Sequence, residues 1–401
     1  MNFPPMMTEG SSRAFKFASS LPQFGWEPVV VAGHTVSGAG VDRFPYQVHY
    51  AGIERCGEET DTEQLFRFVH GLPQQRFSFR KRSSGTTRSN GCSGEGGWER
   101  RAAVVAGQVL QDDPDIEMIY AQAPPFAPHR LGLELSAKYH LPVMFDCTAS
   151  FADEKQEISI MHSGHCVTMP SRAMKEFFLR KYRGKLFHDD ISIVRSGFDP
   201  EIFGVLKPEE PAGAMMRWVF HVEKADGKEL KNFFSGLSAF VESQQAARGF
   251  LSFVFTGLGS EAVGRYLKKY RLEELVDAGP VCSHSEELEL CMRADIYCVV
   301  LGKGDGYEFF VPERLYDVMG TSASFAGVLP EGLAKQVIYE AGGRTASIEK
   351  VETIVELLQE TFILWRSGQL SQVPGSVTED YSMRSVMQEF LREMAARLPL
   401  V

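Results

Sequence analysis

Short apolar runs alternate with longer amphipathic stretches throughout the first half of this chain, the former typical of buried strands and the latter of helices. Ser11 or Ser12 is expected to cap the first helix, Gly25 to end it, and Ser171 to cap a later one. The predicted helices are 13–23, 98–112, 131–139 and 173–182, and the predicted strands are 28–32, 118–121, 143–145 and 191–194.

The same alternation resumes after residues 198–214, where Pro, Glu and Gly interrupt it and mark a domain boundary. The chain is therefore predicted to be an α/β protein of two domains, 1–200 and 201–375, each with a parallel sheet covered on both faces. Residues 376–401 form an amphipathic tail helix expected to pack back on the first domain. The predicted strands here are 218–221, 251–256, 296–300 and 324–328, and the predicted helices are 228–245, 261–270, 285–294 and 333–339.

Composition narrows the class of protein. The chain has 401 residues, 44% hydrophobic and 23% charged, with a net charge of −10, which fits a soluble protein and gives no basic field for nucleic acid. It has no apolar run of about 20 residues and no basic-then-apolar leader, so we expect a cytoplasmic protein. The seven cysteines show no C-x-x-C pair and are expected to be reduced. His162, His165 and Cys166 lie close in sequence but lack further ligands, so no metal is expected.

Residues 71–97 differ from the rest because they are rich in Gly, Ser and Arg and almost free of aliphatic side chains. This composition predicts a mobile loop. Its basic stretch, 76–88, has two interpretations: a peripheral contact with anionic lipid of the inner membrane face or with an acceptor phosphate, or a solvated loop.

Two glycine-containing turns are candidates for holding phosphate. Gly10, Ser11 and Ser12 stand directly before a predicted helix, and Gly257 follows a predicted strand. Helix N-termini present free N–H groups to anions, and ligands of open α/β sheets bind at the carboxyl ends of the strands. We therefore expect a ligand in a cleft between the two domains. The alternative for the second turn, an ordinary tight turn, stays open.

Several sequence blocks, taken in order, resemble family 4 bacterial glycosyltransferases. The resemblance covers nearly the whole chain, and the order and spacing of the blocks are more specific than any block alone. The blocks are Phe3-Pro4-Pro5, Gly10-Ser11-Ser12-Arg13, Leu21 to Val30, Pro124-Pro125 with His129 and Gly132, Leu141-Pro142 with Asp146, Val167 to Met174, Ser196 to Pro200 with Phe203, Gly279 to His284, and Val311 to Gly320.

That resemblance implies a GT-B fold of two Rossmann-like domains and a retaining transfer that needs no catalytic metal and no cofactor. The partners it implies are a nucleotide-sugar donor and a saccharide or lipid-linked acceptor. Gly10, Ser11 and Ser12 would lie under the donor diphosphate. The base pocket would be lined by Val281, Ser283 and His284.

The resemblance also assigns candidate residues to the donor sugar and the leaving group. Arg314 matches a cationic position facing the donor, and Asp317 matches the second Glu of a Glu-x7-Glu pattern near the donor hydroxyls. The alternative for these two is a surface ion pair on one helix. Lys224 and Lys228 are candidates for neutralising the leaving diphosphate, with solvated lysines as the alternative. His129 would point into the cleft, or would be a satisfied surface histidine.

Three departures from the family's pattern bear on activity. The family has an apolar strand ahead of Phe-Pro-Pro, so we expect this sequence to lack the first central strand of the N-terminal domain, which would expose backbone groups of the sheet. The family's Asp-Phe-Arg-Asp-Pro-Trp segment corresponds to Phe145 to Phe151, which loses the arginine and the second acid. The first Glu of Glu-x7-Glu falls on Phe309, with Glu308 one residue out of register.

Three functions therefore compete. The first is an active glycosyltransferase that builds a cell-surface polysaccharide or glycolipid. The second is a degenerate, non-catalytic relative that binds or scaffolds. The third is a nucleotide-sugar epimerase of the same fold, whose catalytic carboxylates are not evident in the sequence.

Overall fold

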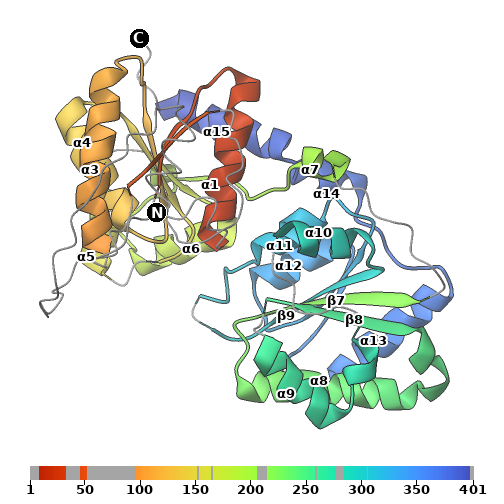
Figure 1. Ribbon diagram of the computed structural model, residues 1–401. Coiled ribbons are helices and arrows are strands. Elements are labelled where there is room, and N and C mark those ends of the chain that lie inside the picture. Colours follow the sequence, from red (N-terminus) through yellow and green to blue (C-terminus); the bar gives the residue numbers. More distant parts are fainter. Residues whose placement is uncertain are drawn as a thin grey trace, which may run out of the picture. The chain divides into compact units, whose positions relative to one another are not determined.

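The chain folds into two compact units, Met1–Val194 with Met387–Val401, and Arg195–Val386. Figure 1 shows the ribbon of the computed structural model. The structure describes residues 9–32, 46–51, 95–150, 153–163, 166–205, 215–257, 260–276, 284–304 and 306–397.

Unit 1 contains two parallel sheets in the part of it that the structure describes. One has four strands in the order β3-β4-β5-β6, and the other pairs β1 with β2. Its elements are α1 (Glu9–Ser20), η1 (Leu21–Phe24), β1 (Val29–Ala32), β2 (Gln47–Tyr50), α3 (Glu95–Asp112), β3 (Ile119–Ala123), α4 (Ala127–Tyr139), β4 (Val143–Cys147), α5 (Glu154–Met161), β5 (Cys166–Met169), α6 (Arg172–Lys181), η2 (His188–Asp190), β6 (Ile191–Ile193) and most of α15 (Met383–Arg397).

Local sequence signals explain where several of these helices begin and end. The Ser171 hydroxyl accepts the Met174 N–H at 3.1 Å, which confirms the predicted cap of α6. Gly25, with φ of +81°, ends η1 as predicted. The prediction that Ser11 or Ser12 caps the first helix is wrong, because α1 begins at Glu9. Gly10 to Ser12 therefore lie in its first turn, where an acidic residue is favoured and N–H groups have no partner within the helix.

A cavity of about 790 Å³ lies in unit 1 between the two sheets. Its lining includes β1, β3 and apolar residues of the helices on both sides. Carboxylate side chains line it as well, among them Glu27, Asp113 and Glu117.

Unit 2 contains one parallel sheet of five strands in the order β11-β10-β9-β7-β8. Its elements are α7 (Pro200–Val205), β7 (Met216–Glu223), α8 (Gly227–Ser243), η3 (Gln245–Phe250), β8 (Leu251–Thr256), α9 (Ser260–Tyr270), η4 (Glu273–Leu275), α10 (His284–Met292), β9 (Ile296–Leu301), α11 (Glu313–Val318), β10 (Ser324–Val328), α12 (Leu333–Glu340), β11 (Arg344–Ala346), α13 (Val351–Arg366) and α14 (Gly375–Asp380).

The unit 2 sheet is buried on both faces. Successive side chains of a strand point to opposite faces, so each strand contributes to both cores. Trp218, Phe220 and Val222 of β7 belong to one core cluster, together with residues of α8 and α13. Val219 belongs to the other, with residues of α11 and α12. His221, two residues after Val219, therefore faces the α10–α11 side of the sheet. This alternation decides which side chains can meet it there.

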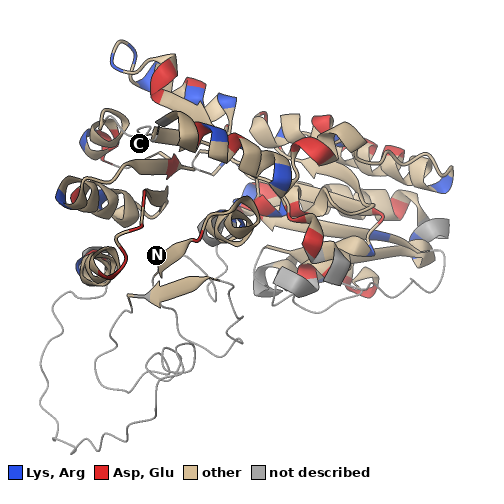
Figure 2. Cartoon of the chain, turned by 90° about the horizontal axis from the view of Figure 1, so that it is seen from above, with Lys and Arg blue, Asp and Glu red and all other residues tan. Residues whose placement is uncertain are grey.

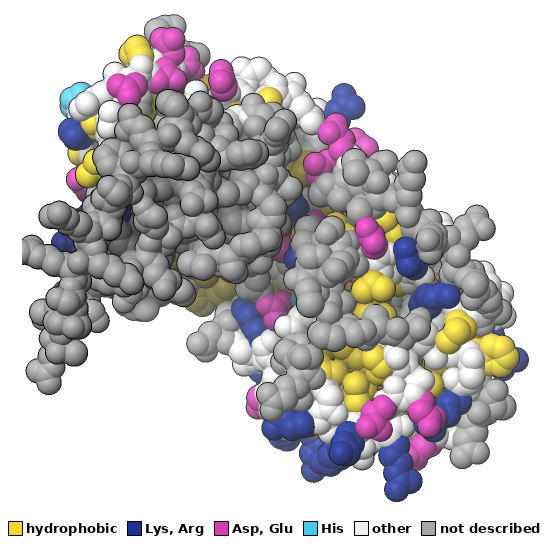
Figure 3. Space-filling view, in the orientation of Figure 1, with side chains coloured by type: hydrophobic (Ala, Val, Ile, Leu, Met, Phe, Trp, Pro, Cys, Tyr) yellow, Lys and Arg dark blue, Asp and Glu magenta, His cyan; other side chains and the backbone are white. Residues whose placement is uncertain are grey.

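The helices and strands predicted between residues 13 and 339 occur within a few residues of their predicted bounds, and the predicted tail helix is divided into α14 and α15. The elements outside the predicted ranges include β2, α5, β5, α7, β11 and α13. Of the predicted loop 71–97, residues 71–94 with the basic stretch 76–88 lie outside the described residues, and the expectation of a loop is wrong for 95–97, which begin α3. Acidic and basic side chains are interspersed along the helices (Figure 2), and Lys and Arg side chains gather over α8 and α9 (Figure 3). Among the described helices, none has the length and apolar character needed to cross a membrane.

Candidate functional site

The order of the strands in unit 2 marks one place where a ligand is expected. The strands lie in the spatial order β11-β10-β9-β7-β8, which is that of a doubly wound sheet. The chain starts at β7, adds β8 on one side and β9 on the other, so the direction of winding reverses between β7 and β9. Ligands of such sheets bind outside the carboxyl ends of the strands at that reversal. Here the two strands end at Glu223 and Leu301, so the residues that follow them, and those packed beside them, form the candidate site.

Two N–H groups in the first turn of α8, which follows β7, are already bonded to a side chain of this chain. The Asp226 carboxylate accepts the N–H groups of Lys228 at 2.8 Å and Glu229 at 2.9 Å. Glu229 in turn accepts the Asp226 N–H at 2.9 Å and the Lys303 N–H at 3.0 Å, which ties α8 to the end of β9. Because this helix start is occupied by the chain's own carboxylates, it is a poor phosphate cradle. The Lys228 side chain is exposed, and its role at the diphosphate stays a prediction.

A buried polar cluster lies on the face of the sheet opposite α8, on the side of α10 and α11. His221 Nδ1 is 2.9 Å from Thr256 Oγ1 and 3.0 Å from Glu287 Oε1. His221 Nε2 is 3.3 Å from Glu223 Oε2. Strands β7 and β8 and helix α10 each contribute a member, so the cluster exists only when these elements are packed together. We call His221, Thr256, Glu287, Arg314 and Asp317 the polar cluster.

Arg314 and Asp317 complete this polar cluster from α11. Arg314 Nε donates to Glu287 Oε2 at 2.9 Å, and Arg314 Nη1 to Asp317 Oδ2 at 3.4 Å. The ion pair on one helix that the alternative interpretation describes is present, but it does not lie at the surface, because the Asp317 side chain is 2% exposed and the Arg314 side chain 19%. Their expected contacts with a donor stay predictions. The sequence had indicated one of Arg314's carboxylate partners, and Glu287 is a second.

Charge and burial set the protonation of this polar cluster. Burial alone would raise the pKa of Glu287, but hydrogen bonding and charge from His221, with the Arg314 guanidinium, lower it to about 2. Burial works against the charge of Arg314, whereas Glu287 and Asp317 raise its pKa. Glu287 is therefore ionised at neutral pH and holds Arg314 in a fixed orientation, with part of the guanidinium side chain reaching solvent.

Gly257 follows β8 with φ of +82°, a conformation that favours glycine. A Cβ at this position would lie 2.5 Å from the Val222 carbonyl oxygen. The turn therefore passes too close to β7 for a side chain, which supports the tight-turn interpretation. Gly259, two residues further along this turn, lies outside the described residues.

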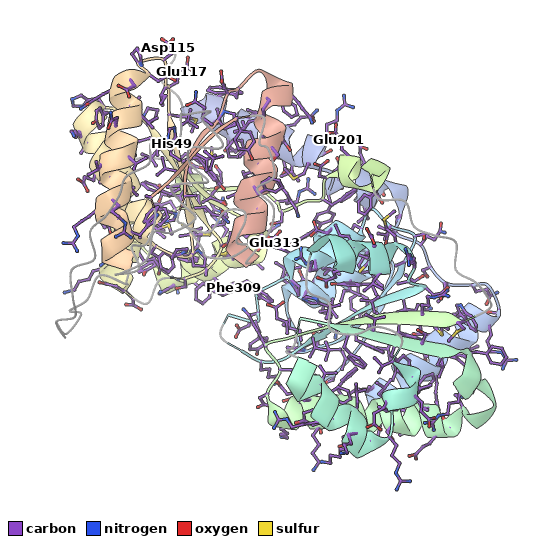
Figure 4. All side chains as sticks on the ribbon, in the orientation of Figure 1. His49, Asp115, Glu117, Glu201, Phe309 and Glu313 are labelled. Carbon is purple, nitrogen blue, oxygen red and sulfur yellow. The ribbon has the colours of Figure 1, made fainter. Side chains whose placement is uncertain are left out.

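Lys224 and Glu308 lie on the loops that follow β7 and β9. Lys224 Nζ is 3.4 Å from the centroid of the Phe310 ring, a cation–π contact across the two loops. The Glu308 side chain is exposed. Figure 4 labels Phe309 and Glu313 in this region, and Glu313 accepts a hydrogen bond from Ser196 Oγ at 3.0 Å. The Lys224 and Glu308 assignments stay predictions.

Unit 1 has a second buried polar cluster, around Asp146 at the end of β4. Arg13 donates to both Asp146 oxygens, at 2.7 and 3.0 Å. Tyr120 and Thr168 donate to the same carboxylate at 2.8 and 2.9 Å. Burial would raise the pKa of Asp146, but the charge and hydrogen bonds of Arg13 lower it. Since Arg13 also donates to the Val194 carbonyl at 2.8 Å, the start of α1 is fixed to the carboxyl ends of β4 and β6.

His129 lies beneath this edge of unit 1 and is 0% exposed. Its Nε2 is 3.0 Å from the Ala121 carbonyl oxygen and 3.2 Å from that of Asp146. Burial lowers the pKa of His129 to about 4, so the ring is neutral at physiological pH. The interpretation as a surface histidine is wrong. The ring joins strands β3 and β4, and a role toward a ligand stays a prediction.

The remaining candidates are only partly described. Gly10, Ser11 and Ser12 lie in the first turn of α1, and His284 is the first residue of α10. Val281 and Ser283 lie outside the described residues, as does His165 of the metal pattern considered above. Across the described stretches, no group of three or more His, Cys, Asp or Glu side chains is placed to hold a metal ion.

Solved structures share this fold. A glycosyltransferase from Rickettsia africae ESF-5 matches with a TM-score of 0.63 and 12% identity, covering 98% of this chain and 96% of that chain. Sucrose-phosphate synthase from Thermosynechococcus elongatus matches at 0.61 and 12%, covering 96% and 92%. HepE of Anabaena in complex with UDP matches at 0.58 and 9%, covering 92% and 99%. No protein-family model and no curated protein matches the sequence.

These likenesses confirm the predicted α/β fold of GT-B type. Membership of family 4 and the expected cleft between the units stay predictions. The residues that sequence reasoning missed are His221, Thr256 and Glu287. The only sequence signal for them was indirect, because polar residues inside or at the ends of buried strands and on a neighbouring helix need partners.

Proposed function

We propose that this protein is a retaining, metal-independent glycosyltransferase that moves a sugar from a nucleotide-sugar to a saccharide or lipid-linked acceptor in cell-surface polysaccharide or glycolipid synthesis. The observation that supports it best is Arg314, a partly exposed cation oriented by the buried Glu287 beside the carboxyl ends of β7 and β8. A fixed cation stabilises negative charge that develops on a leaving diphosphate.

Two contacts of Arg314 differ in length, and the difference suggests how this side chain would bind a donor. The bond to Glu287 is 2.9 Å, and the contact with Asp317 is 3.4 Å. An incoming phosphate would replace the longer contact, while Glu287 keeps the guanidinium in place. Asp317 would then be available to accept hydrogen bonds from donor hydroxyls. UDP and UDP-glucose are the first ligands to test, because HepE of Anabaena has been solved in complex with each.

The test is binding of UDP by titration calorimetry, followed by turnover of UDP-glucose. We expect Arg314→Ala to weaken UDP binding by about 10- to 100-fold, the loss of one charge-assisted hydrogen bond of roughly 1.5–3 kcal/mol. The matched control is Arg344→Ala, which removes an exposed arginine of β11 in the same unit. Equal affinity for UDP in Arg314→Ala and the unchanged protein contradicts the proposed role of Arg314.

A second function, nucleotide-sugar binding without transfer, is favoured by the burial of Asp317. A carboxylate that is 2% exposed and paired with Arg314 reaches a sugar only if the ion pair opens. This alternative predicts UDP binding that Arg314→Ala weakens, together with no release of UDP from UDP-glucose in the presence or absence of an acceptor. Release of UDP at a measurable rate excludes it.

A further inference from the structure

We propose that Phe310 is a positioning residue for the diphosphate of a nucleotide-sugar, because its ring holds the ammonium of Lys224 beside the carboxyl ends of β7 and β9. This role rests on the proposed function, since that function brings a diphosphate to this edge of the sheet. Phe310 acts only through Lys224 and is given no contact with the substrate.

The loops that follow β7 and β9 are pressed together because two glycines leave room for them. The Gly302 N–H donates to the Glu223 carbonyl oxygen at 3.1 Å. A Cβ on Gly302 would overlap the Lys224 carbonyl oxygen and the Ala225 Cα. A Cβ on Gly304 would lie 3.1 Å from the Lys224 Cβ. The loop after β9 therefore runs directly against the backbone and the side-chain stem of Lys224.

The Lys224 side chain is restricted at its backbone, along its stem and at its ammonium. The backbone has φ of +54°, a left-handed conformation that is uncommon for residues other than glycine. The stem lies against Gly304, and Nζ is 3.4 Å from the centroid of the Phe310 ring. These three restrictions define one place for the ammonium, directly after the end of β7.

Phe310 can serve as a fixed platform because its own loop is held in place. The side chain packs, partly buried, against the core cluster on the α11–α12 side of the sheet. The Phe310 N–H donates to the Tyr307 carbonyl oxygen at 3.4 Å. The Leu333 N–H donates to the Glu308 carbonyl oxygen at 2.8 Å, which ties the loop to the start of α12. The position of the ring is therefore set by the fold of unit 2 and needs no ligand.

An aromatic ring positions a cation differently from a carboxylate. The face of a ring attracts an ammonium through its quadrupole but carries no net charge, so the pair of Lys224 and Phe310 keeps the full charge of the ammonium. Arg314, in contrast, is oriented by the carboxylate of Glu287. Negative charge develops on a leaving diphosphate, and a cation that is already in place stabilises it without the entropy loss of ordering a flexible lysine.

The experiment measures the binding of inorganic pyrophosphate to the 401-residue chain by titration calorimetry. We expect Phe310→Leu, which stays apolar but removes the ring, to weaken binding by about 3- to 30-fold, the range that cation–π contacts span. Phe310→Tyr keeps the ring face and should bind within about twofold of the unchanged protein. The matched control is Tyr339→Leu, which removes a ring that lies 5.8 Å from the Lys335 ammonium on α12 and should leave binding unchanged.

A double-mutant cycle separates positioning from packing. If Phe310 acts through Lys224, then Lys224→Met weakens pyrophosphate binding and Phe310→Leu adds no further loss in that background. A loss of packing alone would weaken binding equally in both backgrounds. Phenylalanine with one, two or three ring fluorines at position 310 provides a second measurement, because fluorine withdraws charge from the ring face and nearly keeps its shape. Affinity should fall with each fluorine, and this series replaces Phe310→Leu if that variant does not fold.

Three results would overturn the role of Phe310. The first is a pyrophosphate affinity of Phe310→Leu equal to or above that of the unchanged protein. The second is an equal loss from Phe310→Leu with and without the Lys224 ammonium. The third is an affinity that does not depend on ring fluorination. If any of these occurs while Arg314→Ala still weakens UDP binding, the proposed function stands without this role; if the unchanged protein binds neither pyrophosphate nor UDP, both are contradicted.

Discussion

Replacing Arg13 by alanine tests the polar cluster that fixes α1 in unit 1. The Arg13 and Asp146 side chains are 1% and 0% exposed, and two of the four hydrogen bonds to the carboxylate come from Arg13. Removing one partner of a buried ion pair costs about 3–5 kcal/mol, because the other charge stays buried. Tyr120 and Thr168 still donate to Asp146, so we expect the lower end, about 3 kcal/mol. With a urea m-value of about 2 kcal/mol per molar, the unfolding midpoint falls by about 1.5 M.

The assay must separate the two units, because two-domain chains need not unfold in one step. Urea unfolding is therefore followed by amide exchange in 143–147 of β4, with 296–301 of β9 as the reference in unit 2. The matched control is Arg180→Ala, which removes an exposed arginine from α6. A loss below about 0.5 kcal/mol in unit 1, or an equal loss in both units, refutes the reasoning that Arg13 holds α1 through Asp146.

Three further predictions concern pH and backbone conformation. The pKa of Glu287 is about 2 in the folded protein against an ordinary value of 4.5. Its contribution of about 3 kcal/mol to the stability of unit 2 is therefore present above pH 4.5 and lost as pH falls toward 2. We expect Glu287→Gln to reduce the change of the unit 2 urea midpoint between pH 6 and 3. The pKa of His129 is about 4 against 6.5, so unit 1 should lose stability as pH falls from 6.5 to 4, and His129→Gln should remove that slope; an unchanged slope contradicts the burial argument. Gly257→Ala should lower the melting temperature, because φ is +82° and the new Cβ meets Val222, whereas Gly264→Ala in α9, with open space around it, should raise it through about 0.5–1 kcal/mol of helix propensity.

The local pattern of apolar and polar residues was enough to predict most of the helices and strands. Runs such as Leu251–Thr256 and Ile296–Leu301 are apolar at nearly every position because parallel strands are buried on both faces, and this property can be read without coordinates. The cap at Ser171 and the helix end at Gly25 follow from short-range hydrogen bonding and backbone sterics. The start of α1 was misjudged because Glu9 and Gly10 give a weaker N-terminal signal than the serines that follow them.

The candidate site was only half predictable, and the reason is distance along the chain. Arg314 and Asp317 are three residues apart on one helix, so their proximity follows from helical geometry. Glu287 contacts Arg314 across 27 residues of sequence, and His221 contacts Glu287 across 66 residues. No local rule brings together residues that lie this far apart in the chain. His129 appears in the sequence as a polar residue near a Pro-Pro turn, and only packing decides that it is buried.

The sequence by itself determined the alternation of strands and helices, the parallel character of the sheets and the pair on α11, because each depends on residues close together in the chain. Tertiary structure alone decided that Arg13 meets Asp146 across 133 residues, that Glu287 holds Arg314, and that a cavity separates β1 from β3. Burial, charge pairing and strand order are properties of the packed molecule, since they depend on which elements become neighbours in space.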